Sequence, residues 1–364
     1  MTQRPPPSSG QGAESEPPLT YSGVGIDFEA RANVVERYKD VSKRASRPEV
    51  LGGIGPFAGL FALGNKYRDP VIVASTDGVG TKVKLAALAG RYEDIGHDIV
   101  YACVNDLLTT GAEPLFFLDY IGSDGLPQEA KVSVVKGIAD ACAGLGMALL
   151  GGETADMPGV YPPGEFDLVG FVVGVVEREA LIDGTKIVAG DLLFALPSNG
   201  LHTNGYSLVR PALNIAMDAS QAEADRRRLE RYEEELGETL ADALLRPHED
   251  YVGVLRPAIS SGVVKGLSHI TGGGLEENIP RILPASLGAR FRRGGWDVPP
   301  VFPFVQRAGS IEGDEMFRVF NMGLGMVIAV APGDAGRLLA EVPAAFEVGV
   351  VVPEVEVEPR VGWQ

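Results

Sequence analysis

The sequence predicts an α/β or α+β protein of two domains, because strand-like and helical patterns alternate along most of the chain. Apolar, β-rich runs are followed by longer stretches in which apolar residues have helical spacing. This alternation is interrupted around residues 177–190, where charged and turn residues are frequent. A length of 364 residues accommodates two ordinary domains. We therefore expect domains over residues 20–177 and 178–364, each a sheet covered by helices.

The first nineteen residues are predicted to lie outside both domains. They are rich in Pro, Ser and Gly and contain too few apolar residues to build a core. They also lack the charged-then-apolar plan of a secretory signal. We expect residues 1–19 to form a disordered tail.

The first domain shows the order β-α-β-α-β. Ile95, Ile99, Cys103 and Leu107 recur every fourth residue and predict a helix that Gly111 can terminate. The other predicted elements are strands at 71–76, 115–121, 147–150 and 166–176, and a helix at 128–145.

The second domain shows a further alternating series. Its predicted strands are at 191–197, 267–271, 324–330 and 346–352, and its helices begin near residues 205, 250 and 275, with a last helix before the final strand. The segment 218–238 is strongly charged with little apolar surface. It predicts either a solvent-exposed helix or a segment that extends away from the domain.

The composition limits the partners of the protein. A net charge of −17 leaves no surplus of cations to neutralise phosphates, so we expect no binding to nucleic acid or anionic membranes. No apolar stretch approaches the roughly 20 residues of a membrane span. Cys103 and Cys142 fall in apolar helical patterns, which predicts buried free thiols and a cytoplasmic location.

Three segments place a carboxylate beside small residues, and we expect them to form a magnesium–nucleotide site. The segments are STDGVGTK (75–82), VNDLLTTGAEP (104–114) and LLGGETADMPG (149–159). Magnesium requires octahedral oxygen coordination, and phosphates require the N–H donors that glycine-lined backbone supplies. The predicted ligands are Asp77, Asp106 and Glu153. Plain structural roles are the alternative, since Asp77 could cap a turn and Asp106 could face solvent.

The first of these segments is not a Walker A loop. That loop needs G-x-x-x-x-G-K-[ST], whereas here Thr81 precedes Lys82. We nevertheless expect Lys82 to contact phosphate as a point charge. The predicted phosphate contacts in this part of the chain are Gly78, Gly80, Thr81, Lys82 and Asn105.

The glycine-rich stretch GGIGPFAGLF (52–61) formally matches the dinucleotide-binding fingerprint, but its context is wrong. The preceding PEVL is too short and Pro-led for a buried strand, and Pro56 would lie within the phosphate turn. We expect Gly52, Gly53 and Gly55 to form a mobile flap over a phosphorylated ligand. A purely structural loop is the alternative.

Polar loops of the second domain are the predicted substrate contacts. SNGLHTNGYSL (198–208) follows a predicted strand and supplies Ser198, Asn199, His202, Thr203 and Asn204. A lone histidine is more often structural, but its polar surroundings and unperturbed pKa near neutrality also make His202 a candidate proton shuttle.

Two further patterns concern anions and metals. Gly272, Gly273 and Gly274 open a predicted helix, where free N–H groups would bind a phosphate, with a plain tight turn as the alternative. His97, His248 and His269 lack the mutual spacing of a zinc site in the sequence, so these histidines predict none.

Taken in order, STDGVGTK, VNDLLTTGAEPLFFLDY, GGETADMPG, HTNGYSLVR and TGGGLEENIPR resemble the phosphoribosylformylglycinamidine cyclo-ligase (aminoimidazole ribonucleotide synthetase) family. The resemblance runs from residue 21 to residue 326, and the combination is specific although no single segment is. It implies a homodimer whose amino-terminal sheets share a β-barrel with helices outside, and an α/β carboxyl-terminal domain. It also implies ATP, Mg²⁺ and the purine-biosynthetic conversion of formylglycinamidine ribonucleotide to aminoimidazole ribonucleotide, with release of ADP and phosphate.

The chain departs from this family at two places. After Pro247 the family usually has Thr-Arg before a tyrosine, whereas this chain has His248, Glu249 and Asp250 before Tyr251. Val319 stands where threonine is common. The guanidinium and hydroxyl groups of those family residues are therefore not available to this chain.

The implied mechanism phosphorylates the formyl-amide oxygen, after which the amidine nitrogen closes the ring. Asp77, Lys82 and His202 are the predicted catalytic residues. One rival is a related small-molecule kinase or selenophosphate synthetase; the latter calls for a reactive cysteine near the amino terminus, yet the first is Cys103. A second rival is a non-catalytic dimeric nucleotide-binding protein, without substrate-stimulated ADP formation.

Overall fold

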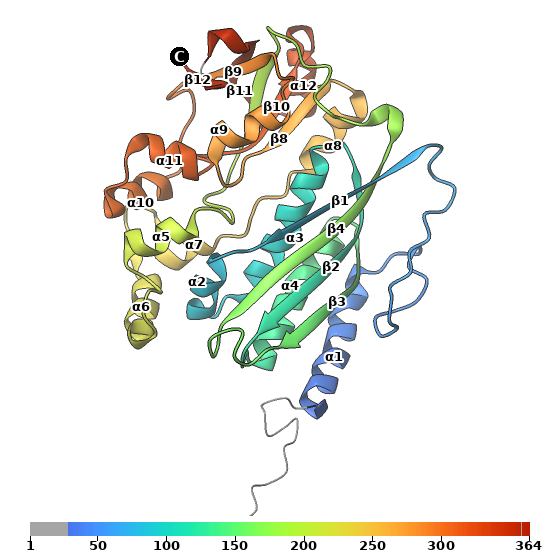
Figure 1. The fold of residues 1–364 in the computed structure, drawn as a ribbon, viewed down its shortest axis with the longest axis vertical. Helices are drawn as coiled ribbons and strands as arrows, with labels where there is room; N and C mark the ends of the chain where they lie inside the picture. The colour runs from blue at the N-terminus through green and yellow to red at the C-terminus, as the bar shows by residue number, and fades with distance from the viewer. Residues whose placement is uncertain (1–27, 358) are drawn as a thin grey trace, which may run out of the picture.

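The computed structural model describes residues 28–357 and 359–364, which form two β-sheets covered by helices (Figure 1). A four-stranded sheet contains strands from residues 70–177, and a six-stranded sheet contains strands from residues 192–363. This arrangement confirms the predicted α/β class with two domains. The tail predicted at residues 1–19 lies outside the described residues.

The four-stranded sheet is mixed and has the strand order β1-β4-β2-β3. Strand β4 pairs antiparallel with both β1 and β2, and β2 pairs parallel with β3. The strands are β1 (Pro70–Gly78), β2 (Glu113–Ser123), β3 (Ala148–Asp156) and β4 (Phe166–Glu177). All four were predicted, although β3 extends six residues past the predicted run and so includes Glu153.

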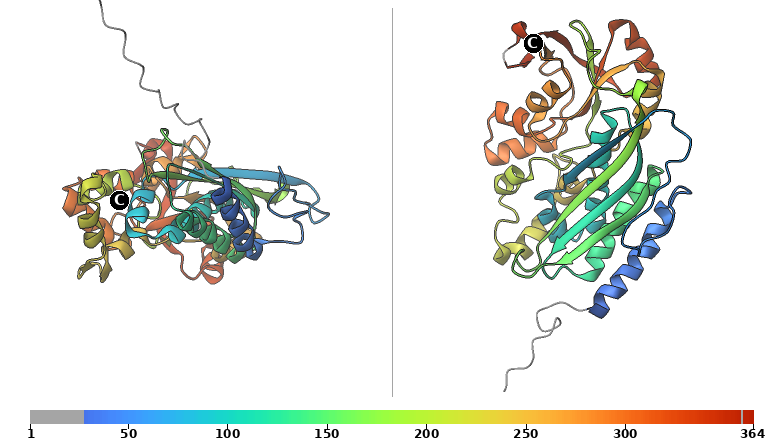
Figure 2. Two further views of the ribbon diagram at one scale, coloured as in Figure 1. Left: turned by 90° about the horizontal axis from the view of Figure 1, so that it is seen from below. Right: turned by 45° about the vertical axis from the view of Figure 1, so that its right-hand side comes forward.

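Helices α3 (Tyr92–Leu108) and α4 (Gln128–Gly144) cover one face of this sheet (Figures 1 and 2). The predicted apolar stripe of α3 is fully buried, and so are both cysteines. The two helices approach closely because each has a glycine at the crossing. A Cβ on Gly96 would lie 2.3 Å from the carbonyl oxygen of Val134, and one on Gly137 would lie 2.1 Å from that of Glu93.

The six-stranded sheet has the order β12-β9-β11-β5-β10-β8. Every residue of β10 is buried, which agrees with its continuous apolar sequence. The strands are β5 (Leu192–Pro197), β8 (Val264–His269), β9 (Leu287–Phe291), β10 (Leu324–Val330), β11 (Phe346–Pro353) and β12 (Val361–Trp363). Strands β9 and β12 were not predicted, since both are short.

The remaining helices surround the two sheets. They are α1 (Phe28–Ser42), α2 (Lys82–Ala89), α5 (Tyr206–Leu213), α6 (Ala222–Leu229), α7 (Leu240–Leu245), α8 (Val252–Ser261), α9 (Gly274–Asn278), α10 (Val301–Gly309), α11 (Gly313–Val319) and α12 (Ala335–Glu341). The charged segment 218–238 contains α6 and the strand β6 (Tyr232–Glu233), which pairs with β7 (Glu238–Thr239). No helix in the described part of the chain is long and apolar enough to cross a membrane.

The two domains are joined through polar side chains on α3. Asp98 accepts a hydrogen bond from the backbone N–H of His248 at 2.7 Å. Asn105 accepts one from the N–H of Tyr251 at 3.1 Å and donates one to the carbonyl of Glu249 at 2.8 Å. Because Asp98 and Asn105 are two helical turns apart, they form one polar stripe that holds the segment 248–251.

A buried ion pair stabilises the same junction. Nζ of Lys82 lies 2.7 Å from Oδ2 of Asp98 and donates to the carbonyl oxygen of Arg246 at 2.9 Å. Both charged side chains are completely buried.

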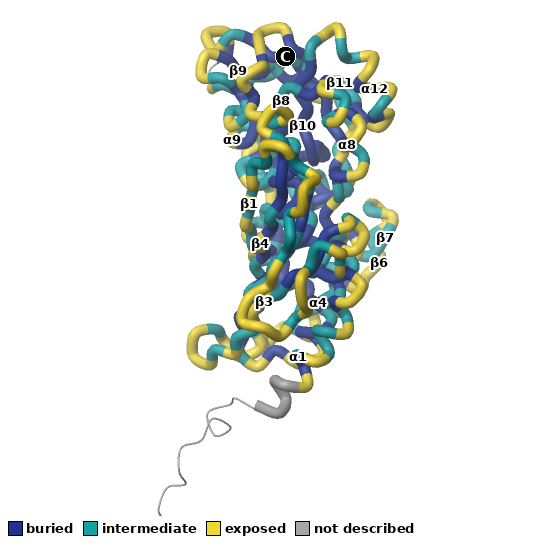
Figure 3. Tube along the Cα trace, turned by 90° about the vertical axis from the view of Figure 1, so that its right-hand side faces the viewer, coloured by how far each residue is buried: buried dark blue, intermediate teal, exposed yellow. Residues whose placement is uncertain are grey.

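The face of the four-stranded sheet opposite α3 is apolar and partly exposed (Figure 3). Thr76, Phe171 and Leu118 are cross-strand neighbours, so their side chains share this face. Phe171 is 39% exposed, and Ile72 on the edge strand β1 is 57% exposed. An apolar sheet face of this kind is typical of a contact surface.

We predict that Lys82→Met lowers the free energy of unfolding by about 3–5 kcal/mol, because it leaves the buried Asp98 without a counter-charge. Urea denaturation measures this loss. The double variant Lys82→Met/Asp98→Leu should recover part of it, and the unpaired N–H of His248 accounts for the rest. A single variant within about 0.5 kcal/mol of the wild type would contradict the role of the pair.

Candidate active site

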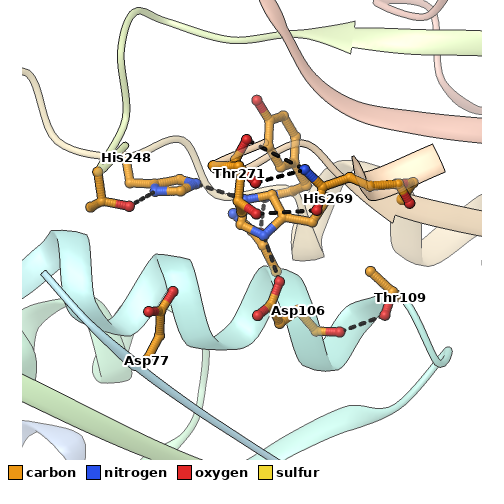
Figure 4. Close-up of polar contacts among 12 residues, drawn as sticks. Asp77, Asp106, Thr109, His248, His269 and Thr271 are labelled. Atoms are coloured by element: carbon orange, nitrogen blue, oxygen red, sulfur yellow. Dashed lines mark hydrogen bonds and ion pairs between the residues drawn. The ribbon is translucent and has the colours of Figure 1, made fainter. Parts of the chain in front are cut away.

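Asp77 and Asp106 lie near each other where α3 passes the end of β1 (Figure 4). Oδ1 of Asp77 accepts a hydrogen bond from the N–H of Gly78 at 2.7 Å. Its cross-strand neighbour is Gly170, whose Cβ position faces Ile99 on α3, so Asp77 faces the helix too. Burial raises the pKa of Asp77, and the negative charge of Asp106 raises it further. Two carboxylates placed near each other in this way favour a bound cation.

Asp106 connects the first domain to a histidine of the second domain. Its Oδ1 lies 2.8 Å from Nδ1 of His269, the last residue of β8 (Figure 4). The Asp106 side chain remains 38% exposed, whereas that of His269 is almost fully buried. A ligand can therefore reach Asp106 while His269 holds one of its oxygens.

Three histidines form a buried cluster beside this contact. Nε2 of His248 lies 3.0 Å from Nε2 of His269, and the ring of His202 stacks on that of His248 with centroids 3.9 Å apart. The two ring nitrogens of His202 are buried and have no hydrogen-bond partner within residues 28–357 and 359–364. The sequence spacing of the histidines gave no indication of this cluster, because the fold brings together three separate loops and strand ends.

The environment of His202 is more buried than the polar loop in its sequence suggested. Burial lowers its pKa well below the ordinary value, and the neighbouring His269 and Lys82 lower it further. The pKa of His248 is lowered for the same main reason. The lowered pKa favours the neutral imidazole, and the proton-shuttle role of His202 stays a prediction.

Two of the predicted phosphate contacts, Lys82 and Asn105, have protein partners in this structure. The ammonium of Lys82 is engaged by Asp98 and by the carbonyl of Arg246, in a fully buried position. The side-chain amide of Asn105 binds backbone groups of Glu249 and Tyr251. Both side chains lie where the second domain packs on the first. Buried polar groups need hydrogen-bond partners there, and the second domain supplies them.

Glu153 does not share a site with Asp77 and Asp106 within one chain. Asp77 is linked across the sheet to Gly170, Asp119 and Gly152 in neighbouring strands. Three strand spacings amount to about 14 Å. Glu153 follows Gly152 and therefore points to the opposite face of the sheet. This separation could not be predicted, because strand order cannot be read from the spacing of motifs.

A cavity of about 1180 Å³ lies beside Glu153 at the β3 edge. Its lining includes Tyr38 on α1, Lys131 on α4, and residues 53–59 of the predicted flap. The flap glycines Gly52 and Gly55 have φ values of +138° and +140°, which side chains rarely adopt. Asp77 and Asp106 do not line this cavity.

The predicted phosphate and substrate loops meet at the junction of the domains. Oγ1 of Thr81 lies 3.2 Å from Oγ of Ser207, which follows the loop 198–205. Gly78 is the last residue of β1, and Gly80 and Thr81 lie in the turn between β1 and α2, beside this loop. Oγ1 of Thr203 lies 3.5 Å from Nδ1 of His248.

Other predicted substrate residues have structural partners. Ser198 is buried and donates hydrogen bonds to the Gly200 carbonyl and to Asn321, while Asn199 donates to the carbonyl of Pro247. Asn204 lies beside Gly272, since a Cβ there would be 3.3 Å from its Oδ1.

The glycine-rich turn 272–274 is tightly constrained. Gly273 has a φ of +91° and Gly274 a φ of +56°, and a Cβ on Gly274 would lie 1.9 Å from the carbonyl oxygen of Phe317. The helix that follows, α9, has only five residues. Its dipole is correspondingly short, so the predicted phosphate contact must depend on the backbone N–H groups alone.

Comparison with known families matches nearly the whole described chain. Residues 59–176 match the family described as AIR synthase related protein, N-terminal domain, and residues 188–362 match the C-terminal domain family. A protein of Desulfitobacterium hafniense named phosphoribosylformylglycinamidine cyclo-ligase is 50% identical over 92% of this chain and 96% of its own length. Proteins of that name from Geobacillus thermodenitrificans and Myxococcus xanthus are each 49% identical, over 92% and 91% of this chain and 95% of their own lengths.

Solved structures share the fold at low sequence identity. Thiamine-monophosphate kinase from Stenotrophomonas maltophilia has a TM-score of 0.61 and 16% identity, over 91% of this chain and 95% of that chain. The hydrogenase maturation protein HypE, in a structure with ATP, has a TM-score of 0.59 and 17% identity, over 85% of this chain and 83% of that chain.

Proposed function

The chain belongs to the phosphoribosylformylglycinamidine cyclo-ligase family, and we propose that it performs the cyclo-ligase reaction at the junction of its two domains. The reaction is the ATP-dependent cyclisation of formylglycinamidine ribonucleotide to aminoimidazole ribonucleotide, with release of ADP and phosphate. The observation that carries the proposed location is the pairing of Asp77 with Asp106 beside loops of the second domain.

Asp77 and Asp106 fit the magnesium ion that this family requires. Both supply carboxylate oxygens, the ligands preferred by Mg²⁺. The pKa of Asp77 is raised mainly by burial and further by the charge of Asp106, and a bound cation would offset both effects. When bound, magnesium would neutralise charge on the transferring phosphoryl group. The turn containing Gly78, Gly80 and Thr81 would place backbone N–H groups beside the phosphates.

The residues around this site would position the ribonucleotide. ATP phosphorylates the formyl-amide oxygen, the amidine nitrogen attacks the same carbon, and the C–O bond to phosphate breaks as the ring closes. Positioning alone contributes up to roughly 7–11 kcal/mol to such an intramolecular step. We assign Thr203, Asn204 and the N–H groups of Gly272–Gly274 to the ribonucleotide. Their loops are adjacent to each other, and His269 connects this part of the second domain to Asp106.

The two domains would bind different substrates. Residues 20–177 would bind ATP and form the dimer, and residues 178–364 would bind the ribonucleotide. The change from the four-stranded to the six-stranded sheet between β4 and β5 supports this boundary. Two buried free cysteines fit the cytoplasmic location that we assign to the enzyme.

A homodimer would cover the apolar face of the four-stranded sheet. Two copies that face each other across a two-fold axis along the strands place β1 of one subunit beside β3 of the other. The end of the partner subunit's β3, with the partner's Glu153 and flap, would then lie near the end of β1 that carries Asp77, whose side chain faces α3 and not the interface. We therefore assign the flap glycines Gly52, Gly53 and Gly55 to the phosphates at the junction of the neighbouring subunit, whereas Glu153 would point into the interface, on the other side of the sheet from Asp77.

The reaction is tested by incubating the purified protein with formylglycinamidine ribonucleotide, ATP and Mg²⁺. We expect aminoimidazole ribonucleotide by mass spectrometry, with one ADP and one free phosphate per product. ADP formation with the phosphate retained on the product would instead indicate a kinase. ATP binding without substrate-stimulated ADP formation would indicate a non-catalytic nucleotide-binding protein.

Asp77→Asn tests the magnesium assignment, because asparagine still accepts the Gly78 hydrogen bond but loses the charge. We expect kcat to fall by at least about 10²-fold, since charge stabilisation of the transition state is lost. The matched control is Asp183→Asn, which removes an exposed carboxylate away from the junction that likewise accepts a backbone hydrogen bond, from the N–H of Thr185 at 3.0 Å. Equal, near-normal turnover in both variants would contradict the assignment.

Phe171→Glu tests the dimer, because it places a charge in the centre of the apolar sheet face. We expect the wild type to be dimeric and this variant monomeric in analytical ultracentrifugation. Val188→Glu is the control, since Val188 is 53% exposed but lies outside the sheet. A dimer that persists in Phe171→Glu would show that this face is not the interface.

A further inference from the structure

We propose that His202, His248 and His269 form a binding site for a divalent transition-metal ion of the zinc type, distinct from the proposed magnesium site. Each histidine offers one ring nitrogen, and the three atoms all lie within 4.8 Å of one another. All three side chains are at least nine-tenths buried. The inference stands on these contacts and does not depend on the cyclo-ligase reaction.

The Asp106 contact orients His269 as a metal ligand. An ionised carboxylate only accepts hydrogen bonds, so Nδ1 of His269 must carry the proton that is shared with Oδ1 of Asp106 at 2.8 Å. Nε2 of His269 then presents a lone pair toward Nε2 of His248. Carboxylate–histidine pairs of this kind fix the tautomer and increase the basicity of metal-bound imidazoles.

His202 has features that the fold alone does not explain. Both ring nitrogens are buried and have no hydrogen-bond partner among the described residues, so their loss of solvation is not compensated. Its backbone has a φ of +59°, in the left-handed region that non-glycine residues rarely occupy. A metal bond would satisfy one ring nitrogen, and strained backbone of this kind gathers at functional sites.

The spacing of the nitrogens suits a tetrahedral ion after a small adjustment. Zn–N bonds of about 2.0–2.1 Å at tetrahedral angles separate ligand nitrogens by about 3.3 Å. The His248 and His269 nitrogens are 3.0 Å apart, close to this value. No pair is more than 4.8 Å apart, so none has to close by more than about 1.5 Å. The ring of His202 must also turn out of its stack on His248 to aim a nitrogen at the ion.

The ligand type separates this site from the magnesium site. Three imidazole ligands favour zinc, cobalt, nickel or copper, whereas Mg²⁺ prefers carboxylate and water oxygens. Three protein ligands leave a fourth position open, as in catalytic zinc sites. His248 is the residue that departs from the threonine usual in the related family, so a three-histidine site would be a property of this chain.

The test uses the full-length protein, stripped with a chelator, equilibrated with Zn²⁺ and passed through a desalting column. We expect one zinc per chain in the wild type and in His97→Ala, which removes the one histidine outside the cluster. His248→Thr and His202→Ala should each retain no zinc. Asp106→Asn should still bind zinc but about 10–100-fold more weakly, because it removes only the orienting partner of His269.

Thermal melting provides a second measurement that is independent of activity. Zn²⁺ should raise the Tm of the wild type and of His97→Ala and leave that of His248→Thr unchanged. A wild type that retains no zinc after desalting would overturn the proposal without reference to any variant. Equal zinc retention by the wild type and a folded His248→Thr variant would overturn it as well.

Discussion

The structure depends on the polar face of α3, because this face fixes how the second domain sits on the first. Asp98 and Asn105 bind the backbone of the segment 248–251, and Asp106 binds His269. Buried polar groups of this kind must find partners or incur a desolvation penalty, so they define a specific domain arrangement. The arrangement in turn brings Asp77, a residue of the first domain, close to the loops of the second.

The same contacts bring potential metal ligands together at the junction of the domains. Carboxylates from the first domain face imidazoles from the second, and the two ligand types favour different metal ions. Asp106 takes part in both groups, since its carboxylate pairs with His269 while its side chain remains partly exposed. Occupancy of one metal site would therefore change the charge that the other experiences.

Sequence reasoning identified the local features of this molecule well. The spacing of Ile95, Ile99 and Cys103 predicted α3, and Asp77 lies at the end of a strand as predicted. The sequence did not indicate that Lys82 and Asn105 would face the second domain, since a polar residue in a helix gives no sign of its partner. The position of Glu153 depends on strand order, and the histidine cluster depends on contacts between distant segments. These features arise from tertiary packing, which motif spacing does not encode.

A crystal structure of the protein with Mg²⁺ and a non-hydrolysable ATP analogue tests the central claim most directly. We expect an ion within about 2.0–2.1 Å of oxygens of Asp77 and Asp106, with phosphate oxygens completing its coordination. An ion bound elsewhere, with Asp77 and Asp106 contacting neither metal nor phosphate, would contradict the assignment of the active site to the domain junction.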